Sequence, residues 1–498
     1  MYDNEFRIII LLFGFLILIY IFFISRNNRK YKVYKTKNYD VKKTIDITAN
    51  SQPHVEFKNI DISTKKEYFP EKTKEIVISG MRPKQLNLPL ADKYIGEIIV
   101  VHSVAQKFYK ISDIYNFMDG PLKNLLVVDL TRVLVGPYCT MILSDLGARV
   151  IKVEAPEIGD DSRKFGPFIK DYSAYFMSLN RGKESIALNL KNNEDKKIFE
   201  KILSKADILV ENFKPGTLEK WGYGWKDVNK KYPKLIYASA SGFGQTGPLK
   251  ELPAYDMVVQ GMGGLMSVTG QPNSEPTRVG TSIGDITAGL FTAIGINAAL
   301  YDRQKTGKGM FIDVSMLDCQ IAILENAIAR YLSNNEIPKP MGSRHPSIAP
   351  FEAFKTQDSY IIIAAGNDKL FEKLCNLLKI PEVCKDPKFS DNSSRAKNMD
   401  ELKKILEDKL SFKKTSEWVN EMEKDKIPCG PIFNIKEAVE NPQVESRNMI
   451  VKAFHKVVGD FKLAGNPIKM SSYKDEKTRG DIPDLDEHRQ KIIKEFCN

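Results

Sequence analysis

The chain has 498 residues, of which 42% are apolar and 28% are charged, and its formal net charge is +11. This composition can bury a large core, which excludes a disordered chain, and the length predicts roughly two to four domains. The six cysteines form no close pair and the five histidines are scattered, which excludes a disulfide-stapled scaffold and argues against a zinc enzyme.

The N-terminal segment of residues 8–24 is apolar and carries no charge, and its length just spans a bilayer core of about 30 Å. Asp3 and Glu5 argue against a mitochondrial transit peptide, and the sequence SRNN at 25–28 is a poor signal-peptidase site. Eight basic residues and one acid follow between positions 26 and 43. We expect residues 1–30 to form an uncleaved transmembrane anchor, and the positive-inside rule places the bulk of the protein on the cytoplasmic or matrix side.

The charge is concentrated near this segment. Residues 1–120 hold 19 Lys and Arg against 13 Asp and Glu, whereas the other 378 residues hold 55 against 50. The basic run is therefore interpreted as a topology signal that also contacts anionic lipid, and no nucleic-acid partner is expected. Residues 31–118 contain short β-like runs and turn signals but no catalytic constellation, so they are assigned as an extension of unknown role.

From about residue 125 the pattern predicts a doubly wound α/β domain. Apolar runs at 125–130, 149–154, 206–210 and 235–240 are typical of buried strands, and Gly136-Pro137 opens a helical segment at 138–146. Strands that alternate with helices predict a parallel sheet, whose ligands bind beyond the carboxyl ends of the strands. This prediction directs attention to the loops at 131–136, 211–216 and 241–247.

Several of these loops have two interpretations. The segment NFKPG at 212–216 offers backbone amides and an Asn side chain to a phosphate or to pantetheine, or it is simply a strand-to-helix turn. The glycine-rich segments SGFGQTGP at 241–248 and QGMGG at 260–264 match neither a dinucleotide fingerprint nor a Walker loop. They allow close approach of a ligand or of a second chain.

The segment GTSIGDITAGL at 280–290 places one carboxylate, Asp285, among small residues before an apolar helical run. Asp285 is either a helix cap or a nucleophile beside backbone amides. Asp256 is a second acid that could share acid and base work with it. His345 lies in the turn-rich segment GSRHPS at 342–347, which is a candidate lid, although a lone histidine is more often structural.

Taken together and in order, these motifs resemble the family III CoA-transferases of the formyl-CoA and carnitine CoA-transferase type. The resemblance covers about residues 121–488 and is carried by DLTRVLVGP (129–137), LGARVIKVE (146–154), NRGK (180–183), ADILVENFKPG (206–216), SGFGQTGP (241–248), GD (284–285), GKG (307–309) and DVSM (313–316). Two departures stand out. The family's C-terminal Gly-Glu-His signature is Asp486-Glu487-His488 here, and nothing in the family corresponds to residues 1–118.

The resemblance implies a mechanism in which Asp285 attacks an acyl-CoA thioester. A mixed anhydride and then an aspartyl-CoA thioester form, and an acceptor carboxylate completes the exchange. Coenzyme A enters as acyl-CoA substrate, with no permanently bound cofactor and no metal. The loop containing Gly342, Ser343 and His345 is implied to be the lid or substrate loop. The implied CoA contacts are Val133, Leu134, Leu188, Lys191, Asn212, Phe213, Lys220 and Met316.

The resemblance also implies a fold: a doubly wound, Rossmann-like large domain with an inserted smaller α+β domain, in an interlocked homodimer. The expected boundaries are 119–320 for the large CoA-binding domain, 321–350 for a linker and lid loop, 351–440 for the small domain and 441–498 for the return to the large domain. The segments at 342–348 and 364–367 look most like succinate–hydroxymethylglutarate CoA-transferases. We therefore expect a succinyl-CoA-like donor, a small carboxylic or dicarboxylic acid acceptor and, by family resemblance, a mitochondrial location.

Two alternatives remain. The first is an α-methylacyl-CoA racemase of the same fold, which moves a proton with a His–Asp pair. The racemase histidine falls where this chain has Tyr255, so the general base is missing. The second is a catalytically silent CoA-binding protein held at a membrane, against which the intact Asp285 argues.

Overall fold

The computed structural model describes residues 119–497, together with the backbone of five short strands in residues 1–118. The chain divides into two compact units, Met1–Met118 and Asp119–Asn498. In the first unit β1 (Ile10–Leu12) pairs with β2 (Phe15–Ile17), and β4 (Glu97–Val101) pairs with both β3 (Glu75–Ser79) and β5 (Phe108–Lys110). The strands β1 and β2 fall within the segment for which a membrane helix is predicted. The rest of that segment and most of the predicted extension lie outside the described residues.

The second unit is built on a six-stranded parallel sheet with the strand order β10-β7-β6-β11-β12-β13. Numbered by their occurrence along the chain, these strands run 3-2-1-4-5-6, which is the order of a doubly wound dinucleotide-binding sheet. The predicted fold class is confirmed. The strand bounds are Leu126–Asp129 (β6), Arg149–Glu154 (β7), Lys183–Ala187 (β10), Ile208–Glu211 (β11), Ile236–Ser241 (β12) and Phe311–Ser315 (β13).

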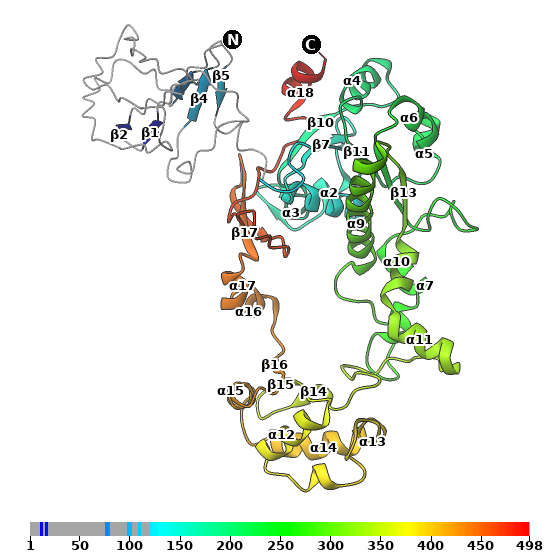
Figure 1. The fold of residues 1–498 in the computed structure, drawn as a ribbon, viewed down its shortest axis with the longest axis vertical. Coiled ribbons are helices and arrows are strands. Elements are labelled where there is room, and N and C mark those ends of the chain that lie inside the picture. The colour runs from blue at the N-terminus through cyan, green and yellow to red at the C-terminus, as the bar shows by residue number, and fades with distance from the viewer. Residues whose placement is uncertain are drawn as a thin grey trace. The chain divides into compact units, whose positions relative to one another are not determined.

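Alternate side chains of these strands enter two separate cores, as the two-residue period of a strand requires. Val127, Ile208 and Ile236 pack against α2 (Val135–Asp145) and α9 (Ile283–Thr306). Leu126, Leu209 and other residues of the opposite face pack against α4 (Asn193–Leu203), α5 (Thr217–Trp221), α6 (Trp225–Lys231) and α18 (Arg489–Phe496). Helices therefore cover both faces of the sheet (Figure 1).

Helix α9 is the one helix among the described residues that is long and apolar enough to cross a membrane, and half of its apolar window is buried inside the fold. Its residues Ala293, Ile296 and Ala299 face the sheet core. Gly289 lets α9 approach α2, since a Cβ there would lie 2.7 Å from the carbonyl oxygen of Val135. These contacts account for the buried half of the apolar surface of α9, whereas Leu290, Phe291 and Ile294 remain exposed.

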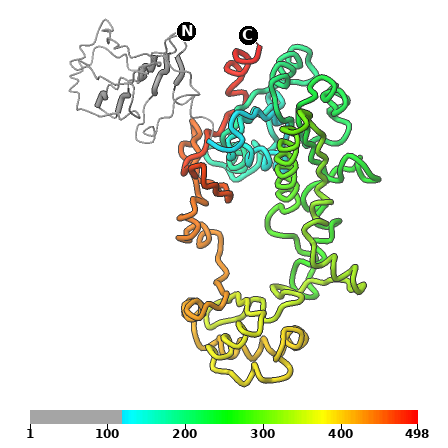
Figure 2. The backbone as a smooth tube through the Cα atoms, viewed as in Figure 1, coloured from blue at the N-terminus to red at the C-terminus, as the bar shows by residue number. Residues whose placement is uncertain are grey.

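A smaller domain is inserted after the large one, and Figure 2 shows the chain leaving through α10 and α11 and returning through the orange segment. It holds an antiparallel sheet of β14 (Phe351–Lys355), β15 (Tyr360–Ala364) and β16 (Cys429–Pro431). Four helices and a 3-10 turn cover this sheet: α12 (Asp368–Leu377), η5 (Val383–Lys385), α13 (Asn392–Lys397), α14 (Met399–Leu410) and α15 (Thr415–Lys424). Phe354, Phe371, Leu402 and Trp418 belong to a core of its own.

The connecting elements of the second unit are short. They are β8 (Phe168–Ile169), β9 (Tyr172–Ser173), α3 (Ala174–Asn180), α7 (Asp256–Met262), α8 (Leu265–Val268), α10 (Met316–Ile323), α11 (Glu325–Asn334), α16 (Ile435–Val439), α17 (Pro442–Ser446), β17 (Ile450–His455) and β18 (Gly459–Ala464).

The C-terminal return closes the free edge of the sheet at β10. Asp486 has a φ of +62°, a conformation that favours glycine, which is the residue of the family signature at this position. Its carboxylate accepts a hydrogen bond from the backbone N–H of Ala187 at 2.7 Å, and the N–H of His488 donates to the carbonyl of Ser185 at 2.9 Å. The departure from the signature is therefore accommodated, because the Asp side chain satisfies an edge N–H that glycine would leave open.

Candidate active site

Asp285 lies in the first turn of α9, and a second carboxylate organises that turn. The N-cap residue Ser282 makes no side-chain capping bond. Instead the Asp256 carboxylate accepts from the backbone N–H of Gly284 at 2.8 Å and from the Gln260 amide at 2.7 Å. Gly284 permits this approach, since a Cβ there would lie 2.7 Å from the Val259 side chain. Helix α7 thus supplies the cap that Ser282 does not provide.

The Asp285 carboxylate is electrostatically unusual. Burial raises its pKa to about 7, and the neighbouring charge of Asp256 adds to the increase. None of the described residues forms a hydrogen bond or ion pair with this carboxylate. Tyr175 on α3 is electrostatically coupled to it, because burial followed by the charge of Asp285 raises the pKa of the phenol to about 12. Within the described part of the chain, Asp285 therefore has no hydrogen-bond or ion-pair partner, and its charge acts on a neutral phenol.

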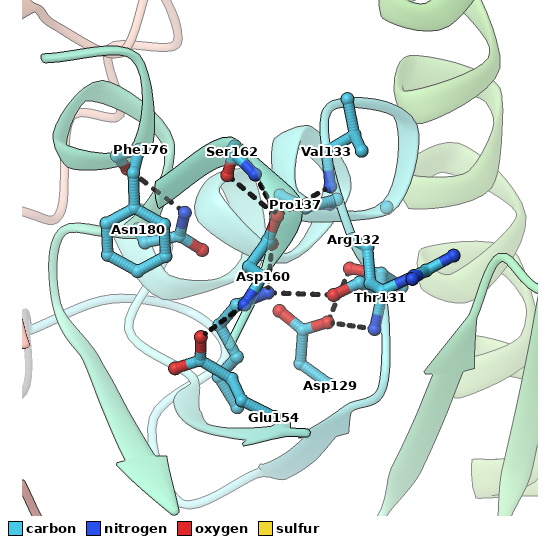
Figure 3. Close-up of polar contacts among 12 residues, drawn as sticks. Asp129, Thr131, Arg132, Val133, Pro137, Glu154, Asp160, Ser162, Phe176 and Asn180 are labelled. Carbon is cyan, nitrogen blue, oxygen red and sulfur yellow. Dashed lines mark hydrogen bonds and ion pairs between the residues drawn. The ribbon is translucent and has the colours of Figure 1, made fainter. Parts of the chain in front are cut away.

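The loop after β6 runs beside this carboxylate and has a strained backbone. Val133 has a φ of +66°, which is a conformational outlier for a β-branched residue. Its backbone N–H donates to the Asp160 carboxylate at 3.0 Å (Figure 3). Next to it Leu134 is buried in a small apolar cluster against which Tyr175 and Ile286 pack. Ile286 directly follows Asp285, so this cluster connects the loop to the first turn of α9.

Two buried lysines hold the loop after β6 through ion pairs and hydrogen bonds. The Lys152 ammonium lies 2.9 Å from the Asp160 carboxylate and donates to the carbonyl of Thr131 at 2.8 Å. Burial alone would lower the pKa of Lys152, but Asp160 and the neighbouring acids outweigh it and hold the pKa above its ordinary value. The Asp160 carboxylate also accepts from Ser162, from its N–H at 2.9 Å and its hydroxyl at 2.8 Å.

The second lysine, Lys183, lies 3.2 Å from the Asp129 carboxylate and also donates to Pro137 and Asn180. Burial lowers the pKa of Lys183 to about 8, against the attraction of Asp129. Asp129 accepts from the Thr131 N–H at 2.8 Å and from the Thr140 hydroxyl at 2.6 Å. The side chains of both Lys–Asp pairs are fully buried. Two positive and two negative charges therefore fix the loop that follows the carboxyl end of β6.

A pocket of about 340 Å³ lies beyond the carboxyl ends of β6, β7, β10 and β11. The order of the sheet reverses between β6 and β11, which is where doubly wound folds bind ligands. The pocket walls combine two cationic side chains, Arg132 and Lys191, with the aromatic rings of Phe213 and Trp221, whose centroids are 5.3 Å apart. Cations beside aromatic rings suit the phosphates and base of a nucleotide.

Only some of the residues predicted to contact CoA lie together at this pocket. Leu188, Lys191 and Phe213 line the pocket, and Val133 and Leu134 lie in the adjoining loop. The Asn212 side chain exchanges two hydrogen bonds with the backbone of Arg132, at 2.9 and 2.8 Å, and so joins the loops after β6 and β11. Five of the eight predicted contacts are not among the residues that line this pocket. Besides Val133, Leu134 and Asn212, they are Lys220, which is exposed on α5, and Met316, which is buried at the start of α10.

A buried glutamate fixes the position of Phe213. The Glu211 carboxyl accepts from the Phe213 N–H at 2.8 Å, and burial raises the pKa of Glu211 to about 7. Sequence reasoning missed this residue, as it missed Lys152, Asp160, Lys183 and Tyr175. The available signal was a charged residue inside an otherwise apolar strand, such as Lys152 in RVIKVE, because a buried charge requires a partner.

The predicted lid loop is held by backbone contacts. The N–H of Gly342 donates to Gly270 at 2.9 Å, and its φ of +66° is one that glycine adopts freely. The Ser343 hydroxyl accepts from Ala353 at 3.0 Å. The His345 ring nitrogen Nδ1 accepts from the Ser347 N–H at 3.1 Å, and the ring lies 5.4 Å from Phe351. In this conformation the side chain of His345 contacts its own loop, at Ser347, and the adjacent Phe351.

The doubly wound sheet and the pocket of about 340 Å³ at its switch point define a class of protein that binds a nucleotide-linked ligand at the carboxyl ends of its strands. The comparisons with known proteins agree. The family model described as CoA-transferase family III matches residues 122–489. The chain therefore belongs to the family III CoA-transferases and is a CoA-transferase.

Relatives and solved structures specify the similarity further. The chain is 47% identical over 379 residues to an acetyl-CoA:oxalate CoA-transferase of Acetobacter aceti, covering 76% of this chain and 96% of that protein. It is 40% identical over 376 residues to a succinyl-CoA:glutarate CoA-transferase of Homo sapiens, covering 75% and 86%. A CAIB/BAIF family protein from Brucella suis superposes with a TM-score of 0.68 at 39% identity, covering 76% of this chain and all of that one.

The buried Lys152–Asp160 pair is predicted to be essential for stability. Replacing Lys152 by Met leaves the Asp160 carboxylate buried without its partner, which costs about 3–5 kcal/mol. Urea unfolding of the full chain measures this loss, with Lys191→Met as the control, since Lys191 is an exposed lysine of the same site. Equal stability of the two variants would contradict the role given to the pair.

Proposed function

We propose that this enzyme moves CoA from a succinyl-CoA-like or acetyl-CoA donor to a small dicarboxylic acid through covalent intermediates on Asp285. The observation that carries the proposal is the position of the Asp285 carboxylate. It has no hydrogen-bond or ion-pair partner among the described residues, Ile286 next to it packs against the loop that borders the pocket, and burial raises its pKa. The relatives that act on oxalate and glutarate by name support a dicarboxylate acceptor.

The reaction proceeds in four balanced steps. An Asp285 oxygen attacks the thioester carbonyl, the C–S bond breaks and CoA thiolate leaves, which forms a mixed anhydride. The thiolate then attacks the aspartyl carbonyl and releases the donor acid, which gives an aspartyl-CoA thioester. The acceptor carboxylate attacks this thioester and expels the thiolate to form a second anhydride. Finally the thiolate attacks the acceptor acyl carbon, which frees Asp285 and completes the new acyl-CoA.

Each step conserves the energy of the thioester, so no ATP is needed, but every intermediate is sensitive to water. Burial of Asp285 serves both demands. It limits the access of water to the half-buried side chain, and it raises the pKa of the carboxylate, which makes the oxygen a better nucleophile than an ordinary aspartate. The cost is that near neutral pH part of the enzyme population carries a protonated Asp285 carboxyl group, which is not nucleophilic.

Among the described residues, this site lacks the histidine that the racemase alternative requires as its general base. At the position of the racemase histidine stands Tyr255, whose side chain is exposed at the start of α7. The histidines of the described residues are His345, His455 and His488. His455 and His488 are engaged elsewhere, with Asp484 and with the Ser185 backbone. Deuterium exchange at the α-carbon of a 2-methylacyl-CoA would overturn the transferase assignment.

The covalent role of Asp285 predicts a trappable adduct. Incubation with succinyl-CoA followed by hydroxylamine should convert Asp285 to a hydroxamate in the wild-type chain, and mass spectrometry of the peptide detects it. Asp285→Asn keeps the shape of the side chain but removes the nucleophilic oxygen, so it should give no adduct and lose CoA transfer by a factor of at least about 10³. An equal adduct in the variant would exclude this mechanism.

The raised pKa predicts a pH profile. The reactive form is the deprotonated carboxylate, so kcat/KM for acyl-CoA should rise about tenfold per pH unit below about pH 7 and level off above it. Asp256→Asn removes a neighbouring negative charge, so the profile should move to lower pH. The shift should be partial, because burial is the larger cause. A profile that is flat from pH 5 to 9, or one displaced to higher pH in Asp256→Asn, would contradict the assignment.

We also propose that the enzyme works as an interlocked homodimer. Support comes from the family and from exposed apolar side chains, which include Ile294 on α9 of the large domain and Met262, Leu332 and Ile435 on the connecting helices α7, α11 and α16. Light scattering of the full chain in mild detergent should give the mass of two chains, and Ile294→Glu should weaken the association. A wild-type monomer at micromolar concentration would refute the dimer.

Residues 8–24 are proposed to anchor the enzyme in a membrane, with the mitochondrion as the organelle. The support is the uncharged 17-residue segment and the eight basic residues that follow it. The full-length chain is predicted to stay in the pellet on carbonate extraction, whereas a chain lacking residues 1–30 is released. Release of the full-length chain would refute the anchor.

A further inference from the structure

A chain of buried polar side chains joins the glycine-rich loop after β12 to a wall of the nucleotide pocket. The side-chain amide of Gln245 donates to the Ser239 hydroxyl at 2.8 Å, and Ser239 bonds in turn to the Glu211 carboxyl. Glu211 and Ser239 are directly paired across the neighbouring strands β11 and β12, and both are buried. The Glu211 carboxyl accepts a further hydrogen bond from the Phe213 N–H at 2.8 Å. We call Gln245, Ser239 and Glu211 the polar relay.

The relay ends on a residue that lines the pocket. The Phe213 ring stands edge-on to the Trp221 ring, with their centroids 5.3 Å apart, and both rings line the pocket. The guanidinium carbon of Arg132, a third lining residue, lies 5.8 Å from the centroid of Phe213. Asn212, between Glu211 and Phe213, holds the backbone of Arg132 through two hydrogen bonds. Residues 211–213 therefore anchor an aromatic wall and a cationic wall of the same pocket.

Electrostatics alone does not favour an acid at position 211. Burial is the main cause of the raised pKa of Glu211, and the neighbouring charges that add to it, Glu219 on α5 and Asp313 on β13, are also negative. The hydrogen bonds from Ser239 and Phe213 oppose this rise. What the carboxyl supplies is an acceptor for two buried donors, which would be unfavourable to leave without a partner.

The relay acts on the pocket and not on the nucleophile. It follows the carboxyl ends of β11 and β12, whereas Asp285 lies in the first turn of α9. The residues that line the pocket fall between positions 130 and 221, so Asp285 is not among them. A change in the relay therefore alters the wall at Phe213 and leaves the carboxylate that carries the acyl chemistry in place.

We propose that Glu211, supported by Ser239 and Gln245, is a positioning residue for the acyl-CoA donor: its carboxyl oxygen holds Phe213 in the conformation in which the ring forms a wall for the nucleotide part of CoA. The inference rests on the proposed function, because the nucleotide it serves is that of acyl-CoA. It assigns a role to the glycine-rich segment at 241–248, whose Gln245 side chain is the far end of the relay.

The test compares full-length variants that differ in what they leave at position 211. Glu211→Met keeps the approximate size of the side chain and removes the acceptor, whereas Glu211→Gln removes the charge and keeps an acceptor oxygen. Ser239→Ala removes the next member of the relay. Asp227→Asn is the control, because Asp227 is an exposed acid on α6 that does not line the pocket.

Four quantities are measured for each variant: the Kd of free CoA by titration calorimetry, the rate of Asp285 adduct formation at saturating succinyl-CoA, the KM for glutarate and the melting temperature. We expect Glu211→Met to weaken CoA binding about tenfold, which corresponds to the loss of one hydrogen bond, and Ser239→Ala to weaken it about threefold. Glu211→Gln and Asp227→Asn should bind CoA within about twofold of wild type. The saturated adduct rate and the KM for glutarate should stay within about twofold in all four variants.

An unchanged Kd of CoA in folded Glu211→Met would overturn the proposal. So would equal losses in Glu211→Met and Glu211→Gln, which would assign the effect to the charge, or a fall in the saturated adduct rate as large as the loss of affinity. If Glu211→Met fails to fold, Ser239→Ala decides, and wild-type affinity in that variant would overturn the proposal. Absence of an adduct in the wild type would instead refute the proposed function, while the Kd of CoA would still test the relay.

Discussion

The buried pairing of two lysines with two aspartates, beneath the loop that follows β6, is the constraint on which the site depends. Moving four charges out of water is expensive, and their mutual attraction offsets that cost only when the geometry is complete. Here the two ammonium groups also donate hydrogen bonds to the backbone carbonyls of Thr131 and Pro137, so the charges hold the main chain of the loop in place. The result is a loop whose strained residue, Val133, is held in place by Asp160.

That loop connects the parts that carry the chemistry. One end borders the nucleotide pocket and is joined through Asn212 to the loop after β11. The other end starts α2, against which α9 packs closely at Gly289. Since Asp285 belongs to the first turn of α9, the same charge pairs that shape the pocket also position the carboxylate. Burial of the Asp285 side chain in this position is the larger cause of its raised pKa, and the charge of Asp256 adds to it.

Much of this arrangement could be predicted from sequence because it follows from local pattern. Apolar runs identified four strands, and the rule for doubly wound sheets identified the loops at their carboxyl ends. Strand β10 was not predicted, because Lys183, Glu184 and Ser185 are polar residues buried by tertiary contacts that a periodic pattern does not reveal. For the same reason the Lys–Asp network was missed: its members are up to 54 positions apart in the chain. Asp486 shows the converse. It departs from the family signature, yet the turn is kept because the Asp486 carboxylate accepts a hydrogen bond from the Ala187 N–H.

The claim that the exchange passes through Asp285 is tested most directly by following oxygen. In a single turnover of the succinyl-loaded enzyme with a diacid labelled in both carboxylates with oxygen-18, the attacking acceptor oxygen should remain on Asp285 when the new acyl-CoA leaves. Mass spectrometry of the Asp285 peptide should then show one labelled oxygen, and the donor acid released in that turnover should be unlabelled. Label in the donor acid together with an unlabelled Asp285 peptide would contradict the covalent role of this carboxylate.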